Sequence, residues 1–363
     1  MSASTTTGPG GIGAWRDQQR TVSGALAHAQ ELTRPVLQQA VESLPANLSR
    51  ICGYHFGWWN HDGESGRTEP VGKALRPALA LLAAQARDDD PTPAVPAAVA
   101  VELVHNFILI HDDVMDDDEL RRGRPTAWKV YGIGPAVLAA DALLAAAFRL
   151  AQQTGHNTAG LLEHAVSSLI AGQAADLDFE LRDPAGIAVA EYLAMAAGKT
   201  SALLVYALTA GAIAGHASAT TVQELKQAGH HLGLAWQAAN DIEDIWGDPQ
   251  VTGKPAMGDL RQGKPTLPVL TALSGGGTAA KDLRESLRAP NREATPHELA
   301  ELIEAAGGRS ATQALSDRHL ERSLAHLGRA TLPAVLHARL ADLFTFIVTR
   351  DHHQHSGPFK EAP

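Results

Sequence analysis

The stretch Val104-His-Asn-Phe-Ile-Leu-Ile-His-Asp-Asp-Val-Met-Asp-Asp-Asp-Glu-Leu-Arg-Arg-Gly-Arg-Pro125 joins an apolar run to a dense cluster of aspartates. Because the apolar part contains neither Gly nor Pro, the pattern predicts a helix that carries the acids at its end. Like charges this dense repel one another, so they persist in a fold only when cations or basic partners neutralise them. Asp112 and Asp116 stand four residues apart and would share one helix face. Two such carboxylates can hold Mg2+, with Asp113 as a further ligand or as support for one.

Three arginines follow the aspartates at once: Arg121, Arg122 and Arg124. Mg2+ keeps coordination positions open for phosphate oxygens, and the planar fork of an arginine fits phosphate bidentately. The combination predicts a diphosphate site. The alternative is a solvated acidic loop followed by a basic turn, which is the usual meaning of a charge block. A second acidic segment later in the chain favours the site.

That second segment covers residues 233–248. Asn240, Asp244 and Asp248 recur every four residues and would share one helix face, with Asp241 beside it. A surface helix with acids at this spacing and no basic partners would be unfavourable. Two acidic helices that face each other could instead clamp a metal–diphosphate between them. The loop after the segment carries the basic residues Lys254 and Lys264.

Composition favours an all-α fold. The chain has 363 residues, enough for a large core, and only 5% of them are aromatic. Stretches rich in alanine and leucine, such as residues 78–86 and 137–151, favour helices by propensity. We expect a single helical domain over residues 21–350. The Thr/Gly/Pro-rich residues 1–20 are expected to form a disordered tail, and residues 351–363 a C-terminal tail.

Charge and cysteine content narrow the class of protein. The formal net charge of -10 argues against a nucleic-acid partner, since phosphate binding normally needs a basic surface. Cys52 is the only cysteine, so no disulfide can form within the chain, which fits the cytoplasm. The N-terminus does not have the pattern of a signal peptide. The apolar run over residues 202–214 is shorter than the roughly 20 residues of a membrane span, so we expect no span.

Several ordered motifs resemble the trans-polyprenyl diphosphate synthases, the farnesyl and geranylgeranyl diphosphate synthase group. The resemblance covers roughly residues 50–350. The motifs that carry it are Gly72-Lys73-Ala74-Leu75-Arg76-Pro77, Asp112-Asp113-Val114-Met115-Asp116, Gly172-Gln173 with Asp176, Gly198-Lys199-Thr200, and Gln237 ahead of the second acidic segment. The resemblance implies an isoprenoid synthase-type helical bundle around a central apolar cavity. It also implies three Mg2+ ions, an allylic prenyl diphosphate substrate and a homodimer.

The same resemblance implies roles for individual residues. The metal ligands would be Asp112, Asp113, Asp116, Asn240, Asp241 and Asp244. The allylic diphosphate would be gripped and positioned by Arg121, Lys199, Thr200, Gln237 and Lys254. A second diphosphate, that of isopentenyl diphosphate, would be held by Lys73, Arg76, His105 and Arg122. In the family, an aromatic residue at the position of Phe107 beside a smaller one goes with geranylgeranyl-type, roughly twenty-carbon products, although plain core packing would also explain Phe107.

One position departs from the family. Its second motif normally begins with Asp, whereas this chain has Asn240, whose neutral carbonyl oxygen should weaken Mg2+ binding. Class I terpene cyclases resemble this version, and Asp244 and Asp248 occupy the later positions of their motif. Two activities therefore stay open: elongation of the allylic diphosphate with isopentenyl diphosphate, or cyclisation to a hydrocarbon with release of diphosphate. The complete set for a second diphosphate favours elongation. An inactive regulatory subunit is a third possibility, against which the intact first motif argues.

Overall fold

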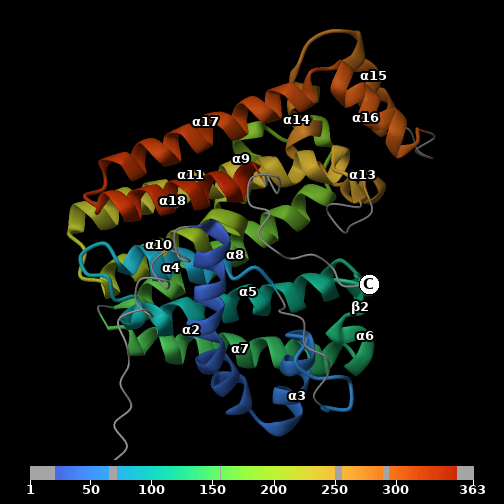
Figure 1. Ribbon diagram of the computed structural model, residues 1–363. Helices are drawn as coiled ribbons and strands as arrows, with labels where there is room; N and C mark the ends of the chain where they lie inside the picture. The colour runs from blue at the N-terminus through green and yellow to red at the C-terminus, as the bar shows by residue number, and fades with distance from the viewer. Residues whose placement is uncertain (1–20, 65–71, 156, 250–255, 289–293, 350–363) are drawn as a thin grey trace, which may run out of the picture.

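The computed structural model describes residues 21–64, 72–155, 157–249, 256–288 and 294–349. The predicted all-α fold is confirmed, since 79% of the described residues are helical (Figure 1). The N-terminal half contains α2 (Val22–Glu42), α3 (Ala46–His55), α4 (Leu75–Ala84), η1 (Thr92–Ala94), α5 (Val95–Met115), α6 (Ala127–Tyr131), α7 (Ile133–Gln153) and α8 (Thr158–Glu180). The C-terminal half contains η2 (Pro184–Gly186), α9 (Val189–Ala196), η3 (Ala197–Ser201), α10 (Ala202–Ala214), α11 (Ala219–Trp246), α13 (Gly258–Gln262), α14 (Leu267–Ser274), α15 (Thr278–Arg288), α16 (Pro296–Ala305), α17 (Gly308–Arg329) and α18 (Ala334–Thr349).

A two-residue hairpin interrupts the helices directly after the first acidic segment. Strands β1 (Leu120–Arg121) and β2 (Arg124–Pro125) pair antiparallel. The turn consists of Arg122 and Gly123, with φ of 52° and 73°, so both residues adopt the left-handed conformation that such two-residue turns require. The hairpin folds the arginines back toward the end of α5.

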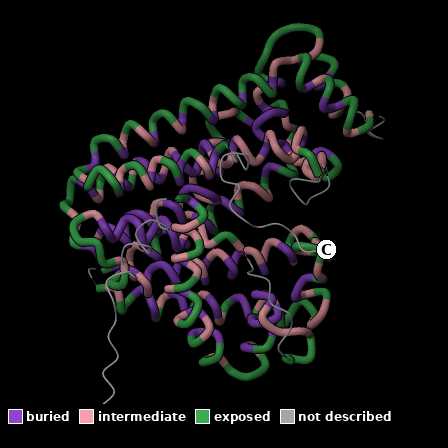
Figure 2. Tube along the Cα trace, in the orientation of Figure 1, coloured by how far each residue is buried: buried purple, intermediate pink, exposed green. Residues whose placement is uncertain are grey.

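Helix α10 lies at the centre of the bundle. It is apolar on all sides and contacts α4, α5, α8 and α11. Its approach to α4 depends on a glycine, because a Cβ at Gly211 would come within 2.8 Å of the Ala80 carbonyl carbon. Figure 2 shows buried residues concentrated along these central helices. The main apolar core extends from Val22 on α2 to Val348 on α18, so the first and last described helices share one core.

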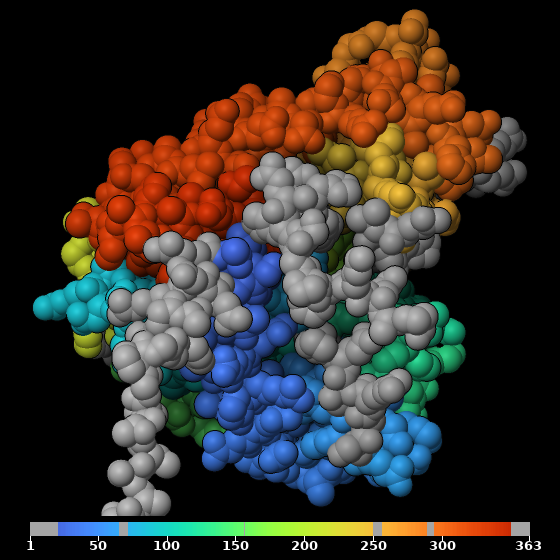
Figure 3. Space-filling view, in the orientation of Figure 1, coloured from blue at the N-terminus to red at the C-terminus, as the bar shows by residue number. Residues whose placement is uncertain are grey.

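The long helices α11 and α17 pack side by side along one edge of the bundle, and the α15–α16 pair extends from the end of that edge (Figures 1 and 3). Hydroxyl groups link the two long helices: Ser316 donates to the Ala235 carbonyl at 3.0 Å and Ser323 to the Ala228 carbonyl at 2.8 Å. Small side chains on both helices permit this close contact. As a result α11, which carries the second acidic segment, is braced along its length.

Helix α11 ends at Trp246, with Gly247 in an extended conformation at its C-cap. Asp248 therefore lies beyond the helix. The expectation that Asn240, Asp244 and Asp248 share one helix face is wrong for Asp248. A four-residue spacing predicts a common face only while the helix continues, and here the backbone becomes extended at Gly247.

Three described helical stretches are long and apolar enough to cross a membrane by length and composition: Thr92–Met115, Ile133–Gln153 and Val189–Ala214. The predicted absence of a span was based on residues 202–214, which are only part of the third stretch. In the fold, 72% and 61% of the apolar windows of the first and third are buried, so packing accounts for their composition. The window on α7 is 39% buried. The absence of a membrane span stays a prediction.

Candidate active site

The first acidic segment occupies the last turn and the C-cap of α5, where the predicted helix ends. The Asp116 amide donates to the Asp112 carbonyl at 2.8 Å, which closes the helix. The Asp113 side chain is 1% exposed and accepts a hydrogen bond from Nε of Arg121 at 2.7 Å. The β1–β2 hairpin therefore returns Arg121 to the acids that precede it in sequence.

The carboxyl groups of Asp112 and Asp113 are in an environment that disfavours their charge. Burial raises the pKa of each to about 6, and for Asp112 the neighbouring Asp116 raises it further while Lys199 acts in the opposite direction. Oδ1 of Asp112 and Oδ2 of Asp113 are buried without a hydrogen-bond partner. Buried carboxylate oxygens without donors fit a hard cation such as Mg2+, which prefers such ligands.

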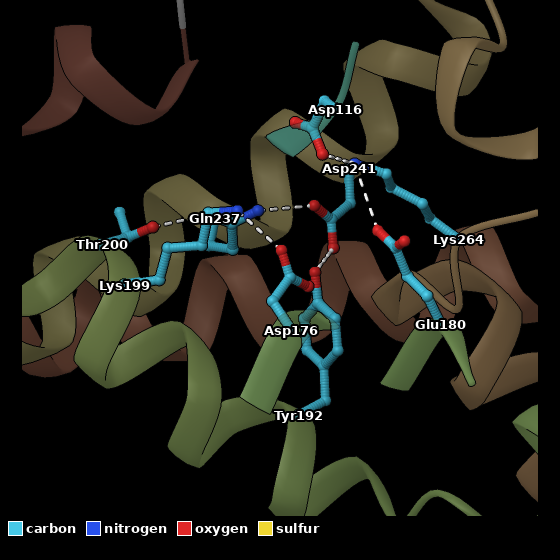
Figure 4. Close-up of polar contacts among 9 residues, drawn as sticks. All are labelled: Asp116, Asp176, Glu180, Tyr192, Lys199, Thr200, Gln237, Asp241 and Lys264. Atoms are coloured by element: carbon cyan, nitrogen blue, oxygen red, sulfur yellow. Dashed lines mark hydrogen bonds and ion pairs between the residues drawn. The ribbon is translucent and has the colours of Figure 1, made fainter. Parts of the chain in front are cut away.

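Asp116 is joined to the opposite side of the site by Lys264. The Nζ of Lys264 lies 3.1 Å from Asp116 and 3.4 Å from Glu180 at the end of α8. Burial lowers the pKa of Lys264, but Asp116 and Glu180 outweigh it and the net pKa is raised, so the ammonium group stays charged. This lysine, which follows α13, thus connects α5 to α8 (Figure 4).

Lys199 lies on η3, a single π-helical turn between α9 and α10. Its Nζ is 2.6 Å from Asp176 on α8. The turn can lie this close to α8 because two glycines meet there: a Cβ at Gly172 would come within 2.9 Å of the carbonyl carbon of Gly198. π-Helical turns are rare and often occur at functional sites. Here the turn places Lys199 and Thr200 at the carboxylates.

A hydrogen-bonded chain connects η3 to the second acidic segment (Figure 4). Thr200 donates to Oε1 of Gln237 at 2.6 Å, and Nε2 of Gln237 donates to Asp241 at 2.8 Å. Asp241 also accepts from the Tyr192 hydroxyl at 2.6 Å and from the Leu267 amide at 3.1 Å. Burial raises its pKa to about 6, although these donors act to lower it. Because protein donors engage both of its oxygens, Asp241 joins α9, α11 and the start of α14. Its role as a metal ligand stays a prediction.

Asp244, one turn after Asn240, accepts a hydrogen bond from the backbone amide of Asp259 at 3.0 Å. The carboxyl group of Asp259 is itself buried among acids. Burial raises its pKa to about 7, and Asp244 and Asp241 raise it as well. Asp259 at the start of α13 is an acidic member of the site that the sequence analysis missed.

The residues proposed for a second diphosphate gather near the start of α4. The Arg76 guanidinium lies 5.2 Å from the centre of the Trp236 ring, and its Nε is buried without a hydrogen-bond partner. Burial lowers the pKa of His105 well below its usual value, and the charges of Arg76 and Arg122 lower it further, so the imidazole is neutral. The Lys73 ammonium lies 5.9 Å from the Phe346 ring.

Two predicted residues have other outcomes. Lys254 lies outside the described residues. Phe107 is 5% exposed, and its ring lies 4.6 Å from that of His111. A mostly apolar cavity of about 1050 Å³ lies between α8, α9, η3, α10 and α11. Phe107 does not line this cavity, and neither do the acids of the site, so its control of product length stays a prediction.

Four residues of the hydrogen-bonded and ion-paired cluster around the acidic segments had no role predicted from the sequence. Glu180, Tyr192, Asp259 and Lys264 all belong to this cluster. The sequence pattern could have identified Lys264, because it is a basic residue that follows soon after an acidic helix. No pattern identifies Tyr192, because its partner Asp241 is far away in sequence.

Comparison with known proteins gives a consistent result. A family model described as polyprenyl synthetase matches residues 66–306. A (2E,6E)-farnesyl diphosphate synthase of Mycobacterium tuberculosis is 41% identical over 334 residues, which cover 90% of this chain and 92% of that protein. A geranylgeranyl diphosphate synthase of the same organism is 42% identical over 300 residues, which cover 81% of this chain and 85% of that protein.

Solved structures lead to the same group. The crystal structure of a polyprenyl synthetase from Streptomyces coelicolor A3(2) superposes with a TM-score of 0.84 at 42% identity, covering 90% of this chain and all of that chain. These relatives are named for making prenyl diphosphates of several lengths. The cyclase alternative gains no support from them.

Proposed function

Because this chain belongs to the polyprenyl synthetase family of prenyltransferases, we propose that it joins isopentenyl diphosphate to an allylic prenyl diphosphate and makes a geranylgeranyl-type product. The observation that carries the proposal is the presence of two separate cation groups. One, with Lys199, Lys264 and Arg121, lies among the carboxylates. The other, around Arg76, lies at the start of α4. An enzyme that handles a single diphosphate needs only the first group.

Mg2+ is expected to bind at the carboxylates. Three ions would be held by Asp112, Asp116, Asn240 and Asp244, with Asp113 supporting Asp112 and Asp116. The unpartnered oxygen of Asp112 and the raised pKa of its carboxyl group fit this assignment. When bound, Mg2+ neutralises the charge that develops on a leaving diphosphate.

The chain's own residues then have distinct tasks. Lys199 and Arg121, now paired with Asp176 and Asp113, would exchange part of these contacts for oxygens of the allylic diphosphate and stabilise it as the carbon–oxygen bond breaks. The hydrogen bond from Thr200 to Gln237 joins η3 to α11 and keeps both side chains in place. Arg76, His105 and Arg122 would hold isopentenyl diphosphate so that its double bond attacks the allylic cation. The released diphosphate is the base that takes up the proton lost from the new chain.

The test is an incubation with farnesyl diphosphate and Mg2+, with and without isopentenyl diphosphate, followed by product analysis. We expect a longer prenyl diphosphate only when isopentenyl diphosphate is present. A hydrocarbon formed without it would overturn the proposal in favour of cyclisation. Product length is measured in a parallel reaction that starts from an allylic diphosphate shorter than farnesyl diphosphate, and a dominant farnesyl product there would reject the geranylgeranyl assignment.

The proposal includes a homodimer in the cytoplasm. Helix α7 is apolar, yet only 39% of its apolar window is buried, and it leaves Ile133 and Leu138 exposed. Ile170 on the adjoining α8 is also exposed. A second copy of the chain would cover these side chains. Light scattering after gel filtration tests this: the wild type should have twice the mass of one chain, and Leu138→Glu should halve it. A monomeric wild type would reject the homodimer.

A further inference from the structure

Arg76 is held differently from the other cations of the site. Arg121, Lys199 and Lys264 form ion pairs with carboxylates at 2.7, 2.6 and 3.1 Å. In the described part of the chain, no ion pair of this kind involves Arg76. Its guanidinium lies over the face of Trp236, at 5.2 Å from the ring centre.

The electrostatics around Arg76 keep it charged. Burial lowers its pKa to about 10, and attraction to Glu102 on α5 acts in the opposite direction. At neutral pH the guanidinium is therefore still a cation. Its Nε is buried without a hydrogen-bond partner. A buried charge without a full set of partners is costly, so a ligand that supplies acceptors there gains affinity.

Stacking on a ring and pairing with a carboxylate have different consequences for a phosphate-binding arginine. A carboxylate occupies the N–H donors that lie in the guanidinium plane, and an incoming diphosphate must displace it. An aromatic ring contacts the face of the plane and leaves these donors available. The ring also restricts the rotamers of a side chain that would otherwise lose entropy on binding.

We propose that Trp236 is a positioning residue for the second diphosphate: its indole ring holds the Arg76 guanidinium in place and leaves the in-plane N–H groups for phosphate oxygens. The inference rests on the proposed elongation activity. Trp236 precedes Gln237 on α11. The same helical turn therefore contacts Asp241 through Gln237 and the Arg76 guanidinium through Trp236.

The experiment compares Trp236→Leu and Trp236→Phe with the wild type. The leucine keeps an apolar side chain but has no π face, whereas phenylalanine keeps a smaller ring. Initial rates are measured while isopentenyl diphosphate and the allylic substrate are varied separately. We expect Trp236→Leu to raise the KM for isopentenyl diphosphate roughly 5- to 30-fold, the effect of losing a partly desolvated cation–π contact. The KM for the allylic substrate should change less than about 2-fold, and Trp236→Phe should recover most of the loss.

A matched control is available on the same helix. Trp246 also lies beneath an arginine, with the Arg309 guanidinium 5.0 Å from its ring centre, but this pair joins the last residue of α11 to the start of α17 instead of to α4. Trp246→Leu should leave the ratio of the two KM values unchanged. A double-mutant cycle with Arg76→Gln provides the second check, because Trp236→Leu should have little further effect once the cation is absent.

Three outcomes would overturn the inference. The KM for isopentenyl diphosphate could stay unchanged in Trp236→Leu, both KM values could rise together, or the effects of Trp236→Leu and Arg76→Gln could be additive. Failure of the proposed function is distinguishable from all three, since the wild type would then form no elongated product. If Trp236→Leu does not fold, Trp236→Phe alone decides, with a smaller rise of the same KM expected.

Discussion

The buried hydrogen bonds that Asp241 accepts predict that the same substitution has unequal effects at two tyrosines. Tyr192 and Tyr206 are 4% and 1% exposed. The Tyr192 hydroxyl donates to Asp241 at 2.6 Å, whereas the Tyr206 hydroxyl is buried without a hydrogen-bond partner. Replacing each by phenylalanine removes one oxygen and changes the shape of the core very little.

The magnitude follows from the charge of the acceptor. A hydrogen bond to an ionised group contributes about 1.5–3 kcal/mol, so Tyr192→Phe should lower the free energy of unfolding by that amount. With an unfolding entropy of about 2.1 cal/mol/K per residue, the 363 residues convert this into a fall in Tm of roughly 2–4 °C. Tyr206→Phe removes a buried polar group that has no partner, so its Tm should stay the same or rise slightly.

The pH dependence of the difference provides a second test. Burial raises the pKa of Asp241 to about 6. At pH 7.5 its carboxylate is ionised and the bond from Tyr192 is charge-assisted, whereas at pH 5 it is largely protonated and the bond is worth less. Scanning calorimetry at both pH values should therefore show a larger effect of Tyr192→Phe at pH 7.5. Equal Tm values for the two variants at pH 7.5 would refute the assignment of Asp241 as a charged anchor.

Three further predictions concern the metal site. Asp112→Ala and Asp116→Ala should each lower kcat by about 10²-fold or more while the circular dichroism of the helices is unchanged, and retained activity at saturating Mg2+ would remove their metal role. Asn240→Asp should lower the Mg2+ concentration for half-maximal activity by a factor on the order of a few, because a carboxylate binds a hard cation more tightly than an amide oxygen, and identical titrations would show that residue 240 is not a ligand. Burial raises the pKa values of Asp112 and Asp113 from 3.8 to about 6, so without metal these groups make the fold less stable as the pH rises from about 4 to above 6. Mg2+ should therefore raise the Tm more at pH 7.5 than at pH 5, and a pH-independent shift would contradict this.

The helical class, the two acidic segments and most of the basic residues that accompany them can be read from the residues without a structure. These features are local: an apolar run without Gly or Pro forms a helix, and acids at its end stay at its end. The order of motifs was also sufficient to indicate the family, because each motif is a short stretch whose residue types are visible without a structure.

Which charges meet depends on how the chain folds. Lys264 contacts Asp116 across 148 positions of sequence, and Tyr192 contacts Asp241 across 49. No periodicity encodes such pairs, since they depend on how α5, α8 and α11 are placed around α10. The end of α11 at Trp246, which removes Asp248 from the acidic face, is likewise visible only in the folded chain, where the backbone becomes extended at Gly247. Burial then raised the pKa values of the acids, and burial is a property of the assembled bundle rather than of any segment.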